Sequence, residues 1–152
     1  MPVPRIEQTM KLRTIIAVAA TVALVGGVFA WREYAREKPD TRTLEAEETI
    51  SAKDLFSAFV ADEQAATARF VGTTEQVVQV NGTIRAIEHP DPALTNVLLE
   101  TEDPLGAVVC EFPKAAVPSF WRAGDAVSIK GICTGSLIDV VLVRCVPADL
   151  KN

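Results

Sequence analysis

The residues of this chain that could do acid–base or metal chemistry are few. The single histidine, His89, stands next to Glu88 and near Asp91 in a proline-rich stretch, HPDPALT. An imidazole with neighbouring carboxylates can serve as a general base or as a metal ligand. A metal site takes several ligands, however, and no second nitrogen or thiolate stands near His89 in the sequence. We therefore expect His89 to be a solvated loop residue.

The remaining nucleophiles and acids do not form a catalytic set either. Ser119 and Ser136 have no assignable base partner, so a Ser–His–Asp triad is unsupported. Glu102 and Asp103 are adjacent, but they precede a turn at residues 104–106 and are expected to be solvated. The sequence thus predicts a protein that is not an enzyme and that holds no metal and no cofactor.

Three cysteines, Cys110, Cys133 and Cys145, fall in stretches that alternate like strands. None has CxxC spacing, which argues against a zinc site. In an oxidising compartment two of them could form a disulfide. The alternative is three buried, small, apolar thiols. The spacing by itself leaves both open.

Charge is unevenly distributed along the 152 residues, whose formal net charge is −5. Residues 1–40 carry six basic and four acidic groups, hence +2, whereas residues 41–152 carry nine basic and sixteen acidic groups, hence −7. Nucleic-acid affinity depends largely on Lys and Arg that displace counterions from phosphates. With one Tyr, two Trp and six Phe, few rings are left to stack on bases. The composition therefore argues against a nucleic-acid partner for this domain.

The elements that must position these residues begin with an apolar run at residues 14–31. As a helix these 18 residues would be about 27 Å long, close to the ~30 Å hydrocarbon core of a bilayer. Lys11 and Arg13 precede the run, and the charges after it balance. This asymmetry predicts a cytoplasmic segment at residues 1–13, a signal anchor at 14–31 and export of the chain from residue 32 onward.

A cleaved signal peptide is the alternative to a signal anchor. Val28, Phe29 and Ala30 place small or tolerated residues where a signal peptidase could cut. The first interpretation makes a single-pass protein of the bacterial inner membrane with its C-terminal domain in the periplasm or outside. The second makes a secreted protein.

The exported part is predicted to consist of a linker, a helix and then strands. Residues 32–50 are charged and are expected to be a linker, and Ser51 and Asp54 form a variant of the capping box before an amphipathic helix at 51–70. Period-two alternation then predicts five strands, at residues 75–88, 96–101, 107–112, 125–134 and 139–146, with a loop at 89–95.

These five strands are expected to form a closed antiparallel barrel. No strand–helix–strand alternation indicates a parallel sheet, and closure removes the two edges that an open sheet would expose. Gly82 and Gly131 stand where tightly coiled strands would need to bend. The fold class is mainly β with helices: a five-stranded barrel domain at residues 51–147, preceded by its helix, and a tail at 148–152.

Several stretches resemble the tRNA-anticodon-binding-like OB-fold family, a family of small exported or membrane-anchored bacterial proteins. They span Ser51 to Val146, and they are the capped helix SAKDLFSAFVADEQAATARF and the segments VNGTI, VCEF, GDAVSIKGICTG and DVVLVRC. The resemblance implies an OB-fold barrel and, by analogy of fold, binding of nucleic acid. It implies no general catalytic activity.

OB folds usually bind ligands along their second and third strands and the adjacent loops. With Val97, Leu99, Val108, Cys110 and Phe112 pointing inward, the outward residues would be Leu98, Glu100, Val109 and Glu111. That face has neither ring nor base, unlike the stacking platforms of single-strand binders. Arg85, Arg122 and Trp121 are scattered and are expected to pack rather than to form a basic track. Candidate ligand-loop residues are Arg85, His89 and Trp121.

The same resemblance bears on the cysteines. The third and fifth strands are neighbours in an OB barrel, which favours Cys110–Cys145 if a disulfide forms, with three free buried thiols as the alternative.

Taken together, these features predict a non-catalytic, membrane-tethered OB-fold binding module on the exported side of a bacterial membrane. Its partners would be the membrane, through the N-terminal helix, and an envelope protein or small ligand. The alternative is a domain that binds single-stranded, tRNA-like nucleic acid.

Overall fold

The computed structural model describes residues 5–35 and 40–148, with side chains from residue 15 onward, and these two ranges belong to two separate compact units. Residues 1–4, 36–39 and 149–152 lie outside the described residues. The start of the predicted cytoplasmic segment, part of the predicted linker and most of the predicted tail are therefore predictions still.

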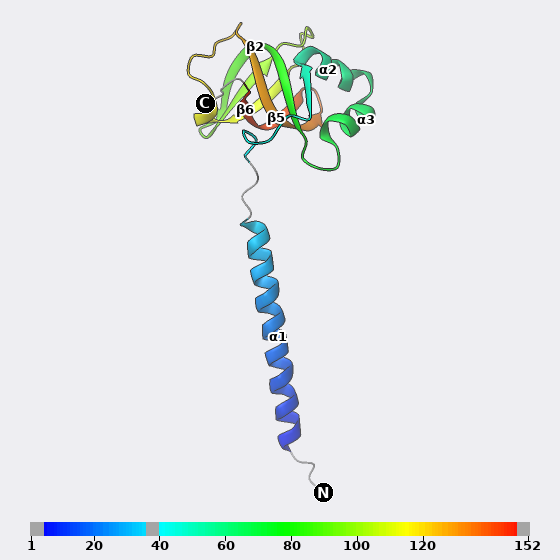
Figure 1. The fold of residues 1–152 in the computed structure, drawn as a ribbon, viewed down its shortest axis with the longest axis vertical. Coiled ribbons are helices and arrows are strands. Elements are labelled where there is room, and N and C mark those ends of the chain that lie inside the picture. Colours follow the sequence, from blue (N-terminus) through cyan, green and yellow to red (C-terminus); the bar gives the residue numbers. More distant parts are fainter. Residues whose placement is uncertain (1–4, 36–39, 149–152) are drawn as a thin grey trace. The chain divides into compact units, whose positions relative to one another are not determined.

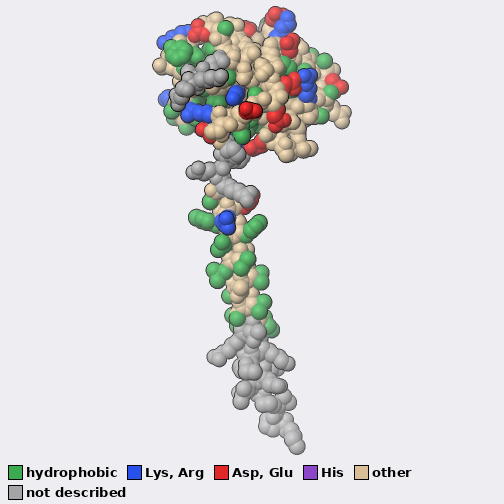
Figure 2. Space-filling view, viewed as in Figure 1, with side chains coloured by type: hydrophobic (Ala, Val, Ile, Leu, Met, Phe, Trp, Pro, Cys, Tyr) green, Lys and Arg blue, Asp and Glu red, His purple; other side chains and the backbone are tan. Residues whose placement is uncertain are grey.

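The first unit is the helix α1 (Arg5–Tyr34), coloured blue in Figure 1. Its segment from Ile15 to Tyr34 has a mean hydropathy of 1.9 and is not buried against any described part of the protein. Hydrophobic side chains stand out along it in Figure 2. The helix is long and apolar enough to cross a membrane, and it also fits a signal peptide.

The second unit is built on a closed barrel of five strands (Figure 1). Their order around the barrel is β2–β3–β4–β6–β5, and pairing of β2 with β5 closes it. The pair β4–β6 is parallel and the other four pairs are antiparallel. The predicted five-stranded barrel is confirmed, but the expectation that all its strands pair antiparallel is wrong for β4 and β6. These two strands are not consecutive, so no hairpin forces them to run in opposite directions. The strands are β2 (Val77–Asp91), β3 (Leu94–Leu99), β4 (Val108–Pro113), β5 (Ala126–Ser136) and β6 (Val140–Pro147).

Alternation is strict on β3 and β4. The buried residues there are the five expected to point inward, Val97, Leu99, Val108, Cys110 and Phe112, together with Thr95. Burial of such apolar side chains is the main favourable term in folding. The register carries one continuous row of buried side chains across four strands, from Val97 to Cys110 to Leu142 to Cys133.

A sixth strand lies outside the barrel. Strand β1 (Glu48–Ser51) pairs in parallel with the start of β2, with Glu48 opposite Val78. Residues 48–50 were expected to belong to the linker. Four residues give no clear alternation along the chain, and the segment becomes a strand because β2 offers it a free edge. An ion pair between Glu48 and Arg69 ties it to the helical region.

The helical region is α2 (Ala52–Ala61), α3 (Glu63–Ala66) and the π-helical turn η1 (Thr67–Val71), grouped together beside the barrel in Figure 1. The predicted cap is present, since Ser51 Oγ accepts a hydrogen bond from Asp54 N at 3.0 Å. The helix is interrupted where it was expected to continue. Asp62 adopts extended backbone angles, and its Oδ1 accepts from Ala65 N at 2.9 Å, so it caps a new helix.

The proline-rich stretch 89–95 is also different from the expected loop. Strand β2 continues to Asp91 and β3 begins at Leu94, so only two residues connect them. A bulge between Glu88 and Asp91 accommodates Pro90, which cannot donate to a ladder, and Pro92 lies in the turn. Asp91 Oδ1 accepts from Ala93 N at 2.7 Å and closes the turn. His89 therefore lies on a strand.

Candidate pocket at one end of the barrel

A cavity of about 450 Å³ opens where the β2–β3 hairpin meets the connection between β4 and β5. This size falls within the ~300–1,000 Å³ usual for small-molecule sites. Three separate chain segments supply its lining. We call this the hairpin pocket; its residues are Ile87, His89, Thr95, Lys114, Val117, Pro118, Ser119, Trp121, Arg122 and Ala123.

His89 is held in place by a neighbour on the next strand. Its Nδ1 shares a hydrogen bond of 3.0 Å with the hydroxyl of Thr95, a residue only 1% exposed. A buried hydroxyl needs a partner, because an unpaired one costs the desolvation energy. The contact therefore fixes one ring nitrogen of His89 against the wall and leaves the other directed elsewhere.

Trp121 forms a buried wall of the hairpin pocket. It is 8% exposed, and its ring meets that of Phe112 edge to face, with centroids 5.9 Å apart and planes at 90°. Aromatic rings prefer this arrangement because the edge of one is positive and the face of the other negative. The indole is thus anchored in the barrel core and presents only a small surface to the cavity.

The segment around Trp121 is closed by its own hydrogen bonds. Arg122 Nη1 donates to the carbonyl oxygens of Ser119 and Trp121 at 2.6 and 2.7 Å. The Arg122 N–H donates to Asp125 Oδ2 at 2.8 Å, and Trp121 N donates to Pro118 O at 3.1 Å. This rim is built before any ligand arrives, which lowers the entropy cost of binding.

Arg85, the third candidate ligand-loop residue, lies elsewhere. It occupies the bulge of β2 between Ile84 and Ala86. Its Nε donates to Glu100 Oε2 at 3.0 Å and its Nη2 to the carbonyl oxygen of Asp103 at 2.9 Å. Arg85 therefore holds the connection between β3 and β4, while His89 and Trp121 share the hairpin pocket. A ligand role for all three stays a prediction.

Ser119 and His89 line the same cavity, which raises the question of a nucleophile and a base. In the part of the chain that the structure describes, no hydrogen bond links the two side chains, and the partner of His89 Nδ1 is a hydroxyl, not a carboxylate. The orienting acid of a triad has no counterpart in this arrangement.

The other candidate nucleophile, Ser136, lines a different hollow. Asp103 Oδ1 accepts from Leu105 N and Gly106 N, as a turn residue does.

The outer face of β3 and β4 has the composition that the alternation predicts. Leu98 and Val109 face each other in register, half-buried, with Asn96 opposite Glu111 beside them. Glu100 lies just past the end of β3 and pairs with Arg85. Within strands β3 and β4 this outward set contains no aromatic ring and no basic side chain.

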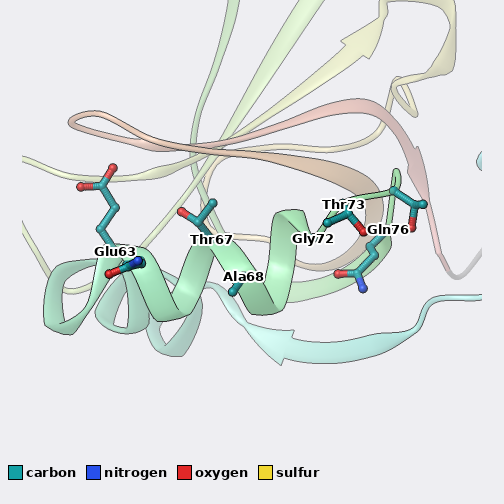
Figure 3. A pocket seen from close by; sticks show the side chains of 8 residues that line it. Glu63, Thr67, Ala68, Gly72, Thr73 and Gln76 are labelled. Atoms are coloured by element: carbon teal, nitrogen blue, oxygen red, sulfur yellow. The ribbon is translucent and has the colours of Figure 1, made fainter.

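A larger hollow of about 760 Å³ lies along α3 and η1. Figure 3 shows Glu63 and Thr67 projecting from the helix, with Thr73 and Gln76 past its end. The lining is of threonines, glutamines and small residues around one acid, and it includes no aromatic side chain. A third hollow, beside the β5–β6 turn, again includes Glu63 and adds Asp139. Neither joins an apolar wall to cationic groups as the hairpin pocket does.

All three cysteines are buried free thiols. Cys145 Sγ donates to Leu142 O at 3.4 Å. Burial, first, and then a hydrogen bond with the Cys110 thiol raise the pKa of Cys145 well above its usual value. Burial also raises the pKa of Cys133. Cys110 and Cys133 flank Leu142 on opposite sides, about 10 Å apart across two strand spacings. That separation excludes a bridge between those two, and Cys110–Cys145 stays a prediction.

The sequence did not single out Lys114 and Thr95 as parts of a site. Lys114 stands nineteen positions after Thr95, and neither belongs to a motif. They come together because β3 and β4 pair in register and the backbone N–H of Lys114 donates to Ala93 O at 2.9 Å. No local pattern could have shown this.

Two of the solved structures that resemble this chain show what it is similar to. One is a candidate nucleic acid-binding lipoprotein from Klebsiella pneumoniae, 14% identical, with a TM-score of 0.49 over 64% of this chain and 89% of that one. The other is a candidate aspartyl-tRNA synthetase from Leishmania major, 11% identical, with a TM-score of 0.41 over 78% of this chain and 24% of that one. No curated protein matches. The tRNA_anti-like family model matches residues 10–146, which confirms the resemblance seen in the strand motifs, and the chain therefore belongs to the tRNA_anti-like family.

Proposed function

We propose that this protein is a non-catalytic, membrane-tethered binding module whose OB-type barrel takes a small ligand in the hairpin pocket. The observation that carries the proposal is the pocket itself: a preformed cavity with an anchored tryptophan wall and a few convergent polar groups. Such a combination is what small-molecule sites in proteins usually have.

The tether rests on α1. The twenty residues from Ile15 to Tyr34 have a mean hydropathy of 1.9 and are unburied, and the basic residues Lys11 and Arg13 precede them in the sequence. That charge asymmetry favours a cytoplasmic N-terminus and a barrel on the exported side of a bacterial membrane. A signal peptide would lead to the same side, and the protein would then be released.

The geometry within the hairpin pocket is the reason why the proposed module is non-catalytic. A general base needs a partner that orients it and a nucleophile within hydrogen-bond reach. The partner of His89 Nδ1 is Thr95 Oγ1, a neutral group that offers no charge to stabilise an imidazolium. The pocket can hold a molecule, and it has no arrangement that would activate one.

The experiment compares a pocket-filling variant with a matched control. Full-length protein in a neutral detergent is screened against a fragment library by ligand-observed NMR, together with Ala123→Trp and Ala115→Trp. Both alanines are exposed, but only Ala123 lines the hairpin pocket. We expect hits that Ala123→Trp abolishes and Ala115→Trp leaves unchanged.

Hits that survive in Ala123→Trp, or a library without any pocket-dependent hit, would overturn the ligand site. Turnover of an ester, amide or phosphoester substrate that is lost in His89→Ala would overturn the non-catalytic assignment. Each of these outcomes is visible without knowledge of the natural ligand.

A further inference from the structure

We propose that the ligand of the hairpin pocket is a small organic monoanion, a carboxylate or an equivalent acid attached to an apolar body. This inference rests on the proposed function, since it names the class of molecule that the same pocket selects. It goes further because it assigns separate roles to the cationic rim and to the apolar wall.

The rim of the pocket is cationic. Lys114 and Arg122 line it, His89 stands beside them, and none of the ten lining residues is an aspartate or a glutamate. Both other hollows described on the barrel unit include Glu63, and one adds Asp139. An anion is therefore attracted to the hairpin pocket and repelled from the other two.

The ammonium group of Lys114 is available for a ligand. The Lys114 side chain is exposed, and within residues 40–148 it makes no ion pair and no side-chain hydrogen bond. Arg122 is different: its Nη1 is committed to two carbonyl oxygens of the rim. Lys114 would contact the anion directly, and Arg122 adds positive charge while it keeps the rim in shape.

Glu88 stands between Ile87 and His89 in the sequence but does not line the cavity. Two other carboxylates close to the lining residues in sequence are engaged with the backbone. Asp91 Oδ1 accepts from Ala93 N at 2.7 Å, and Asp125 Oδ2 accepts from Arg122 N at 2.8 Å. Neither lines the cavity. They lower the positive potential at the rim, but they do not occupy the place of a bound anion.

The wall of the pocket is apolar. Ile87, Val117 and Pro118 are half-buried, and Trp121 is almost fully buried behind them. Water against such a wall is displaced favourably by an apolar group. A bare inorganic anion would leave the wall uncovered, whereas an acid with an aliphatic or aromatic body would meet both surfaces at once.

Charge over the whole domain argues against a polyanion as the ligand. Residues 41–152 carry nine basic and sixteen acidic groups, so a phosphate chain that leaves the pocket would meet net negative charge. A single acid group confined to the rim avoids this repulsion. The observations therefore favour a small monoanion over an oligonucleotide.

The experiment uses Trp121 as the reporter. The chain has two tryptophans, and Trp31→Phe in α1 leaves Trp121 as the only one. Full-length Trp31→Phe protein in a neutral detergent is titrated with 3-phenylpropanoate and with 3-phenylpropanamide, which has the same body without the charge. We expect the carboxylate to bind about tenfold more tightly than the amide, the size of effect that hydrogen bonds to charged groups bring.

Two lysine variants test where the preference arises. Lys114→Gln is expected to reduce carboxylate affinity to that of the amide and to leave the amide unchanged. Lys53→Gln removes the same charge from an exposed lysine that pairs with Glu102 outside the pocket, and it is expected to change neither affinity.

Equal affinity for the two compounds would overturn this inference and leave the proposed function standing, because the pocket would then be a neutral apolar site. An equal loss in Lys53→Gln and Lys114→Gln would also overturn it, because the preference would come from the charge of the whole domain. If neither compound changes Trp121 fluorescence and the fragment screen finds no pocket-dependent hit, the proposed function fails as well.

Discussion

At the scale of single residues, close packing at glycines decides how the helices and strands meet. A Cβ on Gly106 would lie 2.1 Å from Cζ of Phe56, and one on Gly131 would lie 2.7 Å from Sγ of Cys145. Real Cβ atoms do not approach other atoms this closely, so each glycine makes room for one specific side chain. Phe56 packs into the barrel core against Gly106. Cys145 points inward against Gly131, and the residue before it, Arg144, has a positive φ.

We expect Gly106→Ala to lower the free energy of unfolding by about 1–3 kcal/mol, as overpacking of a core usually does. Urea unfolding of the full chain in detergent measures it. In a Phe56→Leu background the same substitution should cost less, because the smaller side chain leaves space for the new methyl group. Equal costs in the two backgrounds would show that Phe56 is not the obstacle.

The cysteine pairing is a second prediction at this scale. If Cys110 and Cys145 form a disulfide, both thiols lose their protons, and two electrons pass to a disulfide-bearing oxidant of the exported compartment. Protein denatured in N-ethylmaleimide should then carry one maleimide. The intact mass of the unlabelled protein should be lower by two hydrogens than that of the fully reduced protein. Cys133→Ala should keep the bridge and Cys145→Ala should lose it. Three maleimides on the wild-type chain would contradict the pairing.

The raised pKa values of Cys133 and Cys145 add a check on the reduced form. Because only the thiolate reacts quickly, buried thiols with raised pKa values should react slowly with a maleimide near neutral pH in the folded protein. Raising the pH should speed their reaction, and unfolding should remove the difference between them and a free cysteine.

At the scale of elements, helix boundaries follow from side chains that satisfy free backbone N–H groups. Ser51 begins α2, and Asp62 both ends it and begins α3. The apolar spacing across residues 55–70 continues through Asp62, which explains why the sequence predicted one helix. The break turns the second half so that Phe70 still reaches the core, 6.1 Å from the ring of Phe59.

Removing the first cap gives the prediction at this scale. Ser51→Ala should lower the free energy of unfolding by about 1 kcal/mol, because Asp54 N–H loses its acceptor. Ser51→Thr should restore most of that loss, because its hydroxyl can accept from Asp54 N–H and donate to Asp54 Oδ2 as that of Ser51 does. Ser57→Ala is the matched control: Ser57 is exposed within α2 and makes no cap, so thermal unfolding should change little. Equal effects at the two serines would refute the capping role.

At the scale of the whole molecule, one chain combines an apolar helix with an acidic barrel. Residues 41–152 carry a net charge of −7, and the outer face of β3 and β4 presents aliphatic and acidic side chains. Both features disfavour phosphate chains, although the family is named for an anticodon-binding fold.

The tether is tested by membrane extraction. We expect the full-length protein to stay in the membrane fraction at alkaline pH and to keep its complete mass. Leu24→Arg, near the middle of the apolar segment, should weaken insertion by about 2.5–3.5 kcal/mol and shift protein to the supernatant, whereas Leu24→Val should not. A mature chain whose mass corresponds to a start after Ala30 would favour the signal peptide instead.

Nucleic-acid binding is tested at low salt. A fluorescein-labelled oligothymidylate titrated with the full chain should show no saturable binding, because the outer face of β3 and β4 has neither the stacking rings nor the basic side chains of single-strand binders. Saturable binding that weakens steeply as salt is added would overturn this prediction, since that dependence is the signature of phosphate contacts.

The sequence by itself determined the features that depend on neighbours along the chain. Alternation placed five strands and the inward residues such as Val97 and Cys110, the serine cap placed the start of α2, and the uncharged run placed the apolar helix. These patterns are local because strand and helix periods, caps and hydropathy act over a few residues.

Only the tertiary structure decided the pairing of β1 with β2, the short turn at residues 91–94 and the grouping in the hairpin pocket. His89, Lys114 and Trp121 come from a strand, a short turn and a connection that the barrel closure brings to one end. The physical reason is that such contacts depend on register and on the free edge of a strand. Neither leaves a pattern in the residues that are brought together.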